Sequence, residues 1–121
     1  MKTNNLIVEM TFDFAIQMVE LYKKLITEKE FVLSKQLFRC GTSIGAYVEE
    51  SVAAQSRKDF IAKLSIASKE ARETRYFLKL LSGSKLVDLD YSVYLNSINS
   101  IINILTKIII TTQKNMNKTG T

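Results

Sequence analysis

The residue types that most often carry catalysis are scarce in this chain. None of its 121 residues is histidine, which removes the usual general base and the commonest transition-metal ligand. The single cysteine, Cys40, falls on an apolar helical stripe, whereas an activated thiol needs exposure and a base or cation beside it. Glu49 and Glu50 are adjacent and point about 100° apart on a helix, so they cannot share a ligand. The sequence predicts a non-enzymatic protein with no metal site and no cofactor.

Basic side chains offer a different chemistry, the binding of phosphate groups. The segment 57–85 carries eight basic and three acidic residues, and several of its cations fall opposite the apolar stripe. A cationic stripe with an outward aromatic side chain can follow a phosphate backbone and stack on an unpaired base. A solvated helix face is the alternative, because Glu70 and Glu73 lie near the arginines and weaken their field. The candidate nucleic-acid-binding residues are Lys58, Lys69, Arg72, Arg75, Tyr76 and Lys79.

Apolar residues recur three and four positions apart in four segments, which predicts four amphipathic helices. The basic side chains named above would lie on these helices. The chain has no proline and only four glycines, so nothing forbids long helices. We expect helices at about residues 6–28, 32–54, 57–82 and 89–114, and a polar tail, 115–121, that frays. Short turns favour antiparallel neighbours. The sequence therefore predicts a single all-α domain, 1–121, folded as an up-down-up-down four-helix bundle. Its innermost residues should include Leu64, Ala71, Leu78, Ile98, Ile102 and Leu105.

Local signals define some helix ends and one close contact. Ser56 can cap the third helix, with Asp59 three residues later reaching back to the exposed amides. Gly83 is available for a left-handed cap at the end of that helix. Gly41 and Gly45, one turn apart in the second helix, are expected to let a neighbouring helix approach closely.

The fourth segment is apolar over roughly half of its circumference, which is more than a single bundle requires. We expect the excess to be buried against a second copy of the chain, and the alternative is a wide core within one chain. The candidate interface residues are Tyr94, Ile101, Ile104 and Ile108 on the fourth helix, and Ile66, Phe77 and Leu80 on the third.

Charge and hydropathy bear on the compartment. The net charge is +5 and the pI is near 9.4, which permits binding to an anionic polymer. The first ten residues lack the features of a secretory signal. The most apolar stretch, 101–110, is interrupted by polar residues and is shorter than the ~20 residues of a membrane span. We expect a cytoplasmic protein that does not enter a membrane.

Several ordered motifs lie between residues 36 and 81. They comprise Gln36-Leu37-Phe38-Arg39, the run from Thr42 to Glu50, Ala54 to Phe60, and Leu64 to Thr74. They follow the pattern Q-L-x-R-x-x-x-S-I-x-A-N-x-x-E-G, then S-x-x-[DE]-F, then I-A-x-x-x-x-x-E. In these motifs the chain resembles the bacterial four helix bundle protein family. Relatives of that family include the 23S rRNA intervening-sequence protein and the accessory variability protein of diversity-generating retroelements.

The resemblance implies an antiparallel bundle that assembles into a ring, commonly a pentamer, with a basic surface that binds nucleic acid. It also implies a reverse-transcriptase-like or ribosomal-RNA-associated partner, although the intervening-sequence members have no established activity. Two positions depart from the pattern: Tyr47 replaces asparagine and Ser51 replaces glycine. Our leading hypothesis is a non-enzymatic homo-oligomer that binds the RNA or DNA backbone or scaffolds a nucleic-acid-associated complex. The alternative is a protein–protein interaction module without nucleic-acid binding.

Overall fold

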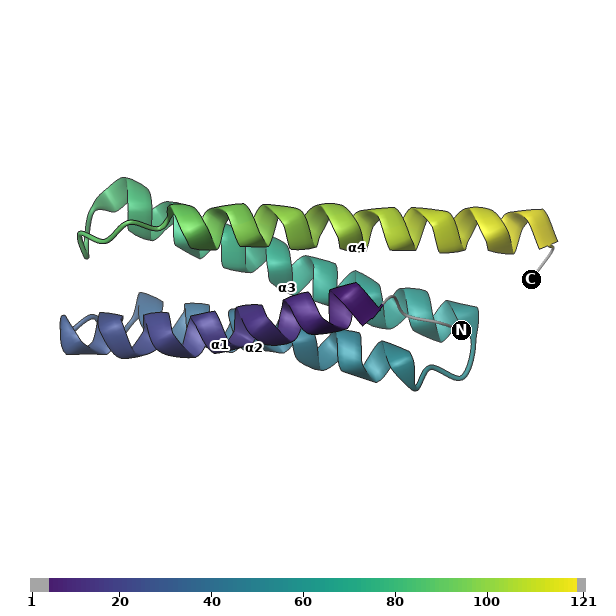
Figure 1. The fold of residues 1–121 in the computed structure, drawn as a ribbon, viewed down its shortest axis with the longest axis horizontal. Coiled ribbons are helices and arrows are strands. Elements are labelled where there is room, and N and C mark those ends of the chain that lie inside the picture. Colours follow the sequence, from purple (N-terminus) through teal and green to yellow (C-terminus); the bar gives the residue numbers. More distant parts are fainter. Residues whose placement is uncertain (1–4, 120–121) are drawn as a thin grey trace.

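The computed structural model describes residues 5–119, which form four α-helices and no strand. In Figure 1 the helices lie along one long axis, and the chain reverses at each of its three connections. This confirms the predicted all-helical class. The helices are α1 (Asn5–Thr27), α2 (Leu33–Val52), α3 (Arg57–Ser84) and α4 (Ser92–Thr119).

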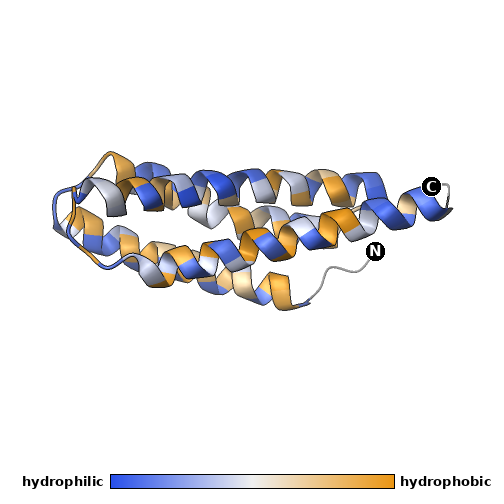
Figure 2. Ribbon diagram, turned by 90° about the horizontal axis from the view of Figure 1, so that it is seen from above, coloured by the Kyte–Doolittle hydropathy of each residue, from blue (hydrophilic) through white to orange (hydrophobic). Residues whose placement is uncertain are grey.

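The predicted apolar stripes form the core. Alternating spacings of three and four place one face of each helix inward, and hydrophobic and hydrophilic residues alternate along the ribbons in Figure 2 as this pattern requires. The six residues expected to be innermost are all at most 3% exposed, which confirms the phasing of α3 and α4. The buried residues of α1 are Ile7, Thr11, Phe14, Met18, Leu21 and Leu25, and those of α3 are Phe60, Leu64, Ala67, Ala71, Thr74, Leu78 and Leu81.

The two glycines of α2 bring it close to α1, as predicted. A Cβ atom added at Gly41 would lie 2.5 Å from Cγ of Met18. One added at Gly45 would lie 3.2 Å from the backbone oxygen of Thr11. Because a side chain at either position would meet α1, the missing side chains set the distance between these helices.

Side chains cap the starts of three helices, α2, α3 and α4. Oγ of Ser56 accepts a hydrogen bond from the amide of Asp59 at 3.0 Å, which confirms the predicted cap of α3. At the start of α2 the cap comes from Glu30, which has no N-cap motif in the sequence. The carboxylate of Glu30 accepts the amides of Val32, Leu33 and Ser34 at 3.1, 2.6 and 2.9 Å. These bonds explain how Glu30 can be buried next to an otherwise uncapped helix end.

The end of α3 differs from the prediction. Gly83 lies inside the helix, and Lys85 adopts the left-handed conformation with φ of 55°. No atom lies within 4 Å of a Cβ built at Gly83, so its surroundings do not require a glycine there.

The limits of α4 also differ from those expected. It begins at Ser92, whose amide donates to Asp90 at 2.9 Å, and this bond lowers the pKa of the Asp90 carboxyl group. It continues to Thr119, so residues 115–119 of the expected frayed tail are helical, while 120–121 lie outside the described residues. In this added stretch Met116 lines a hollow together with Lys58 and Ile61 of α3.

Among the described residues, one stretch, Ser92–Lys118 of α4, is long and apolar enough to cross a membrane by length and composition. The core helix of a soluble protein meets the same criteria. Ile98, Ile101 and Leu105 of this stretch are buried in the bundle core.

Candidate nucleic-acid interface

The cationic residues predicted on α3 lie on its solvent side. Lys58, Lys69, Arg72 and Lys79 are exposed, and 61% of Tyr76 is accessible. Arg75 is half-buried, and its Nη1 donates to Oδ1 of Asn99 on α4 at 3.1 Å. The structure therefore places all six candidates along one side of α3, with Arg75 as the link to α4.

The acidic residues of α3 are engaged elsewhere. Arg39 of α2 donates from Nη2 to the carboxylate of Glu73, and its Nη1 lies 3.6 Å from Oε2 of Glu70. The Glu73 carboxylate is the main cause of the raised pKa of the Arg39 guanidinium. Asp59 lies at the N-terminal cap. Glu70 and Glu73 thus form ion pairs across to α2, and not with Arg72 and Arg75 as their spacing suggested.

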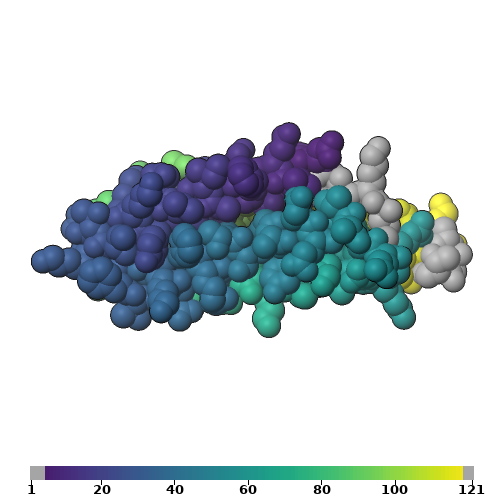
Figure 3. Space-filling model, turned by 90° about the horizontal axis from the view of Figure 1, so that it is seen from below, coloured from purple at the N-terminus to yellow at the C-terminus, as the bar shows by residue number. Residues whose placement is uncertain are grey.

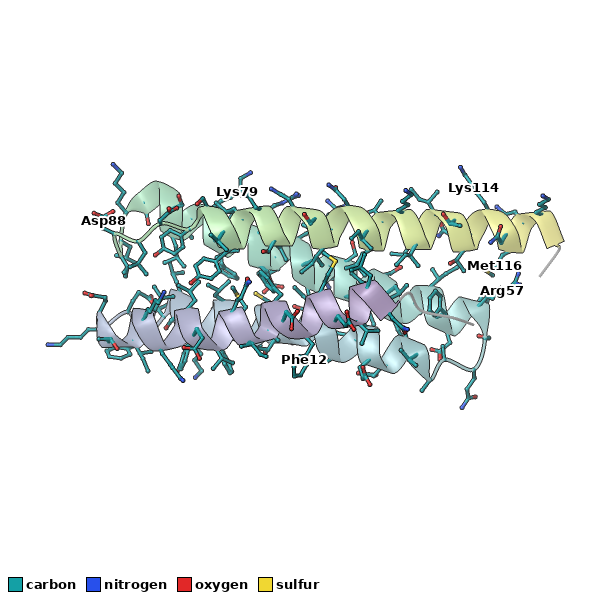
Figure 4. All side chains as sticks on the ribbon, in the orientation of Figure 1. Phe12, Arg57, Lys79, Asp88, Lys114 and Met116 are labelled. Atoms are coloured by element: carbon teal, nitrogen blue, oxygen red, sulfur yellow. The ribbon has the colours of Figure 1, made fainter. Side chains whose placement is uncertain are left out.

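The fourth helix adds polar and basic residues that are not among the six predicted candidates. Asn96, Asn103, Lys107 and Lys114 are exposed, and α4 contains no aspartate or glutamate. In Figure 4 Lys79 of α3 and Lys114 of α4 project from the same side of the molecule. The sequence contains a sign of this basic surface on α4, because no aspartate or glutamate follows Asp90 in the chain.

We call this surface the α3–α4 face. Its members are cationic, amide or aromatic side chains, and none is a carboxylate. They are Lys58, Lys69, Arg72, Arg75, Tyr76, Lys79, Asn96, Asn99, Asn103, Lys107 and Lys114.

The α3–α4 face has the shape and charge to bind a linear polyanion. From Lys58 to Lys79 the cations extend along α3 for about 30 Å, at a rise of 1.5 Å per residue. Amide side chains can donate to phosphate oxygens beside the cations, and Tyr76 offers a ring for stacking. The described residues contain no group of histidine, cysteine or acidic side chains that could hold a metal ion. This geometry fits electrostatic binding along a phosphate backbone.

The prediction that Ile101 lies at an interface is wrong. Ile101 is 1% exposed and lies in the core, because α4 contacts both α1 and α3 and needs a wide apolar arc within its own chain. Tyr94, Ile104, Ile108 and Phe77 are half-buried and pack against this core. Ile66 and Leu80 retain 36% and 37% of their accessible surface. The wide-core alternative therefore explains Ile101, and the remaining six residues keep surface available for a contact.

The two departures from the motif pattern have structural roles. Ser51 is fully buried, and its Oγ donates to the backbone oxygen of Val48 at 2.6 Å. Tyr47 is half-buried and packs against the core. Cys40 is fully buried, as predicted from its stripe, and burial raises the pKa of its thiol. None of these three side chains belongs to the α3–α4 face.

Comparison with known proteins identifies relatives of the chain. The family described as 23S rRNA-intervening sequence protein matches residues 3–107. A crystal structure of a protein of unknown function from the S23 ribosomal protein family of Bacteroides thetaiotaomicron VPI-5482 is 46% identical. The alignment covers 85% of this chain and 97% of that one, with a TM-score of 0.82. No curated protein matches the chain.

Proposed function

The chain belongs to the 23S rRNA-intervening sequence protein family, and we propose that it is a non-enzymatic oligomer that binds the phosphate backbone of RNA or DNA. The observation that carries this proposal is the absence of any carboxylate from the α3–α4 face. The acidic residues of α3 lie at its cap or beside Arg39, and α4 has none. Each exposed cation of the face is thus free to replace counterions along a nucleic acid.

Assembly into a ring would strengthen this binding. Ile66 and Leu80 lie on the edge of α3 that also carries Glu73, toward α2. Ile104 and Ile108 follow Ile101 at helical spacing, toward α1. Two different edges would meet in a head-to-tail contact between copies of the bundle. Such a contact forms a ring where the rotation between neighbouring copies closes. A pentamer is the expected form, and it would repeat the α3–α4 face around the assembly.

In the cytoplasm such a ring would hold nucleic acid or scaffold a ribosomal-RNA-associated or reverse-transcriptase-like partner. The binding would tolerate sequence variation, because contacts to phosphates position a nucleic acid without reading its bases.

Filter binding of an RNA hairpin and a DNA duplex of equal length tests the proposal. Affinity should fall as salt rises from roughly 50 to 200 mM, and each cation that meets a phosphate should add about 0.7 to 0.9 to the log–log slope. The double variant Arg72→Glu with Lys79→Glu should lower both the affinity and the slope. The matched control, Lys24→Glu with Lys35→Glu, makes the same charge change at exposed positions on α1 and α2.

Helicity and oligomer mass should stay unchanged in both double variants. Equal losses in the two variants would indicate that net charge alone drives binding. Absence of binding at the lower salt concentration would overturn the proposal and favour a module that binds only proteins. Tyr76→Ala should weaken single-strand binding more than duplex binding, because stacking contributes roughly 1–3 kcal/mol per unpaired base.

A further inference from the structure

A groove lies between the outer surfaces of α1 and α2. Its volume is about 790 Å³, and Figure 3 looks onto the face that these two helices form. We call it the α1–α2 groove. Its lining residues are Val8, Glu9, Phe12, Asp13 and Ala15 of α1, and Thr42, Gly45, Ala46 and Glu49 of α2.

Small residues of α2 and an exposed aromatic residue of α1 line the groove. Gly45 and Ala46 contribute little side-chain volume, which leaves the surface of α2 low at this point. Phe12 is 64% exposed, and Ile16, one turn further along α1, is 49% exposed. Neither side chain contributes much to the core, yet both present apolar area to water. Exposed apolar area beside a groove is typical of an interaction surface.

Three residues that line the groove carry carboxylates. Glu9 and Asp13 lie one turn apart on α1, Glu49 lies on α2, and all three are exposed. None of them forms an ion pair within residues 5–119, where the paired glutamates are Glu20, Glu50, Glu70 and Glu73. Like charges at a spacing of four residues destabilise a helix slightly, so the fold does not need this arrangement.

We propose that the α1–α2 groove binds an amphipathic helix of a partner protein that carries lysine or arginine along both edges of its apolar stripe. The lining residues span eight positions on each helix, seven steps of about 1.5 Å or about 10 Å in all, which matches two turns of a bound helix. A partner helix docked in this way would place an apolar side chain against Phe12. The lysines or arginines of the partner helix would then lie opposite the three carboxylates of the groove. Charge complementarity identifies the partner as basic, although the chain as a whole carries a net charge of +5.

This surface is separate from the nucleic-acid face. In Figure 4 Phe12 projects from α1 on the side of the molecule away from Lys79 and Lys114. A partner helix in the α1–α2 groove therefore leaves the α3–α4 face open, and the two contacts can form together.

A synthetic peptide pair tests the proposal on the full chain. One peptide of about 18 residues, five turns of helix, carries leucines at positions i, i+3, i+4 and i+7, with lysines beside them. The other has the same leucines with glutamate at every lysine position. By fluorescence anisotropy, the lysine peptide should bind and the glutamate peptide should not. Phe12→Ser should weaken binding about tenfold or more, as expected for an aromatic anchor.

Matched controls separate the groove from general charge. Tyr76→Ser removes an aromatic side chain of similar exposure, 61%, from the α3–α4 face and should leave peptide binding unchanged. The triple variant Glu9→Gln, Asp13→Asn, Glu49→Gln should weaken binding and flatten its salt dependence. A control triple, Glu20→Gln, Glu28→Gln, Asp88→Asn, makes the same charge change at other exposed positions and should have little effect.

Three outcomes would overturn the proposal. The first is binding of neither peptide, and the second is an equal loss in both triple variants. The third is a fall in oligomer mass when Phe12 is replaced by serine, which would show that a second copy of this chain fills the groove. Nucleic-acid binding by the Phe12→Ser variant should remain at the wild-type level, so the two proposals can fail independently.

Discussion

Arg39 on α2 donates a hydrogen bond from Nη2 to the carboxylate of Glu73 on α3, and its Nη1 lies 3.6 Å from Glu70. Arg39 and Glu73 are both positions of the motif pattern through which the chain resembles its family. The ion pair therefore joins the second helix to the third at two motif positions far apart in sequence. It also keeps two acidic side chains of α3 beside α2, so the α3–α4 face is free of carboxylates.

Removing Arg39 should cost more than removing a fully exposed ion pair. Arg39→Gln leaves Glu70 and Glu73, with side chains only 15% and 34% exposed, close together without a cation. We expect the free energy of unfolding to fall by about 1–2 kcal/mol, against at most about 0.5 kcal/mol for Lys23→Gln. Lys23 pairs with Glu20, and both of those side chains are mostly exposed. Urea denaturation followed by circular dichroism measures both values, and equal losses would contradict the prediction.

Periodicity predicted most of the fold because it reports burial directly. The residues at alternating spacings of four and three, from Ile7 to Leu25 in α1 and from Phe60 to Leu81 in α3, are all buried. That spacing puts them on one face of the helix, and an apolar face is removed from water by packing inward. The cap by Ser56 was also predictable, because its partner lies only three residues away.

Features that depend on neighbouring helices could not be predicted in the same way. A helical wheel does not show which flank of α3 faces α2, so Arg39 was not connected with Glu73. Nor does it show how much of the apolar arc of α4 is covered by the same chain, so the predicted interface includes Ile101, which is buried in the core. The groove beside Phe12 depends on the contact between α1 and α2 and left no periodic signal.

Two glycine-to-alanine substitutions should have opposite effects. Gly83→Ala should stabilise the protein by about 0.4–1 kcal/mol, because alanine favours a helix and the added methyl group enters open space. Gly41→Ala should destabilise it by about 1–3 kcal/mol, because the methyl group would lie 2.5 Å from Cγ of the buried Met18. Melting temperatures of the two variants provide the comparison. A gain from Gly41→Ala would mean that the Met18 side chain can move aside at little cost.

The buried thiol of Cys40 should make stability depend on pH in the alkaline range. Burial raises its pKa in the folded chain above the ordinary value of 9.0, so the folded state keeps a proton that the unfolded state loses. Stability is therefore unaffected by this group below pH 9 and falls as pH rises from there toward the folded pKa. Between pH 9 and 10 urea denaturation should show a downward slope that Cys40→Ala reduces. Burial also raises the pKa of Tyr91, which should add a second decline above pH 10 in both proteins.

The α3 edge of the proposed ring contact can be tested without disturbing the core. Ile66 and Leu80 are 36% and 37% exposed, so glutamate at both positions should be tolerated by the monomer and rejected by an apolar interface. The wild-type protein should have a mass several times 13.8 kDa in light scattering at micromolar concentration. The Ile66→Glu, Leu80→Glu variant should be smaller and equally helical.

Ile101 is unsuitable for this experiment, because it is buried and a charge there would unfold the bundle itself. Ile110→Glu is the matched control, since Ile110 is 45% exposed on α4 and is not one of the proposed interface residues. Its oligomer mass should equal that of the wild type. A wild-type mass of one chain, or an unchanged mass in the Ile66→Glu, Leu80→Glu variant, would rule out this edge of α3 as a contact between copies.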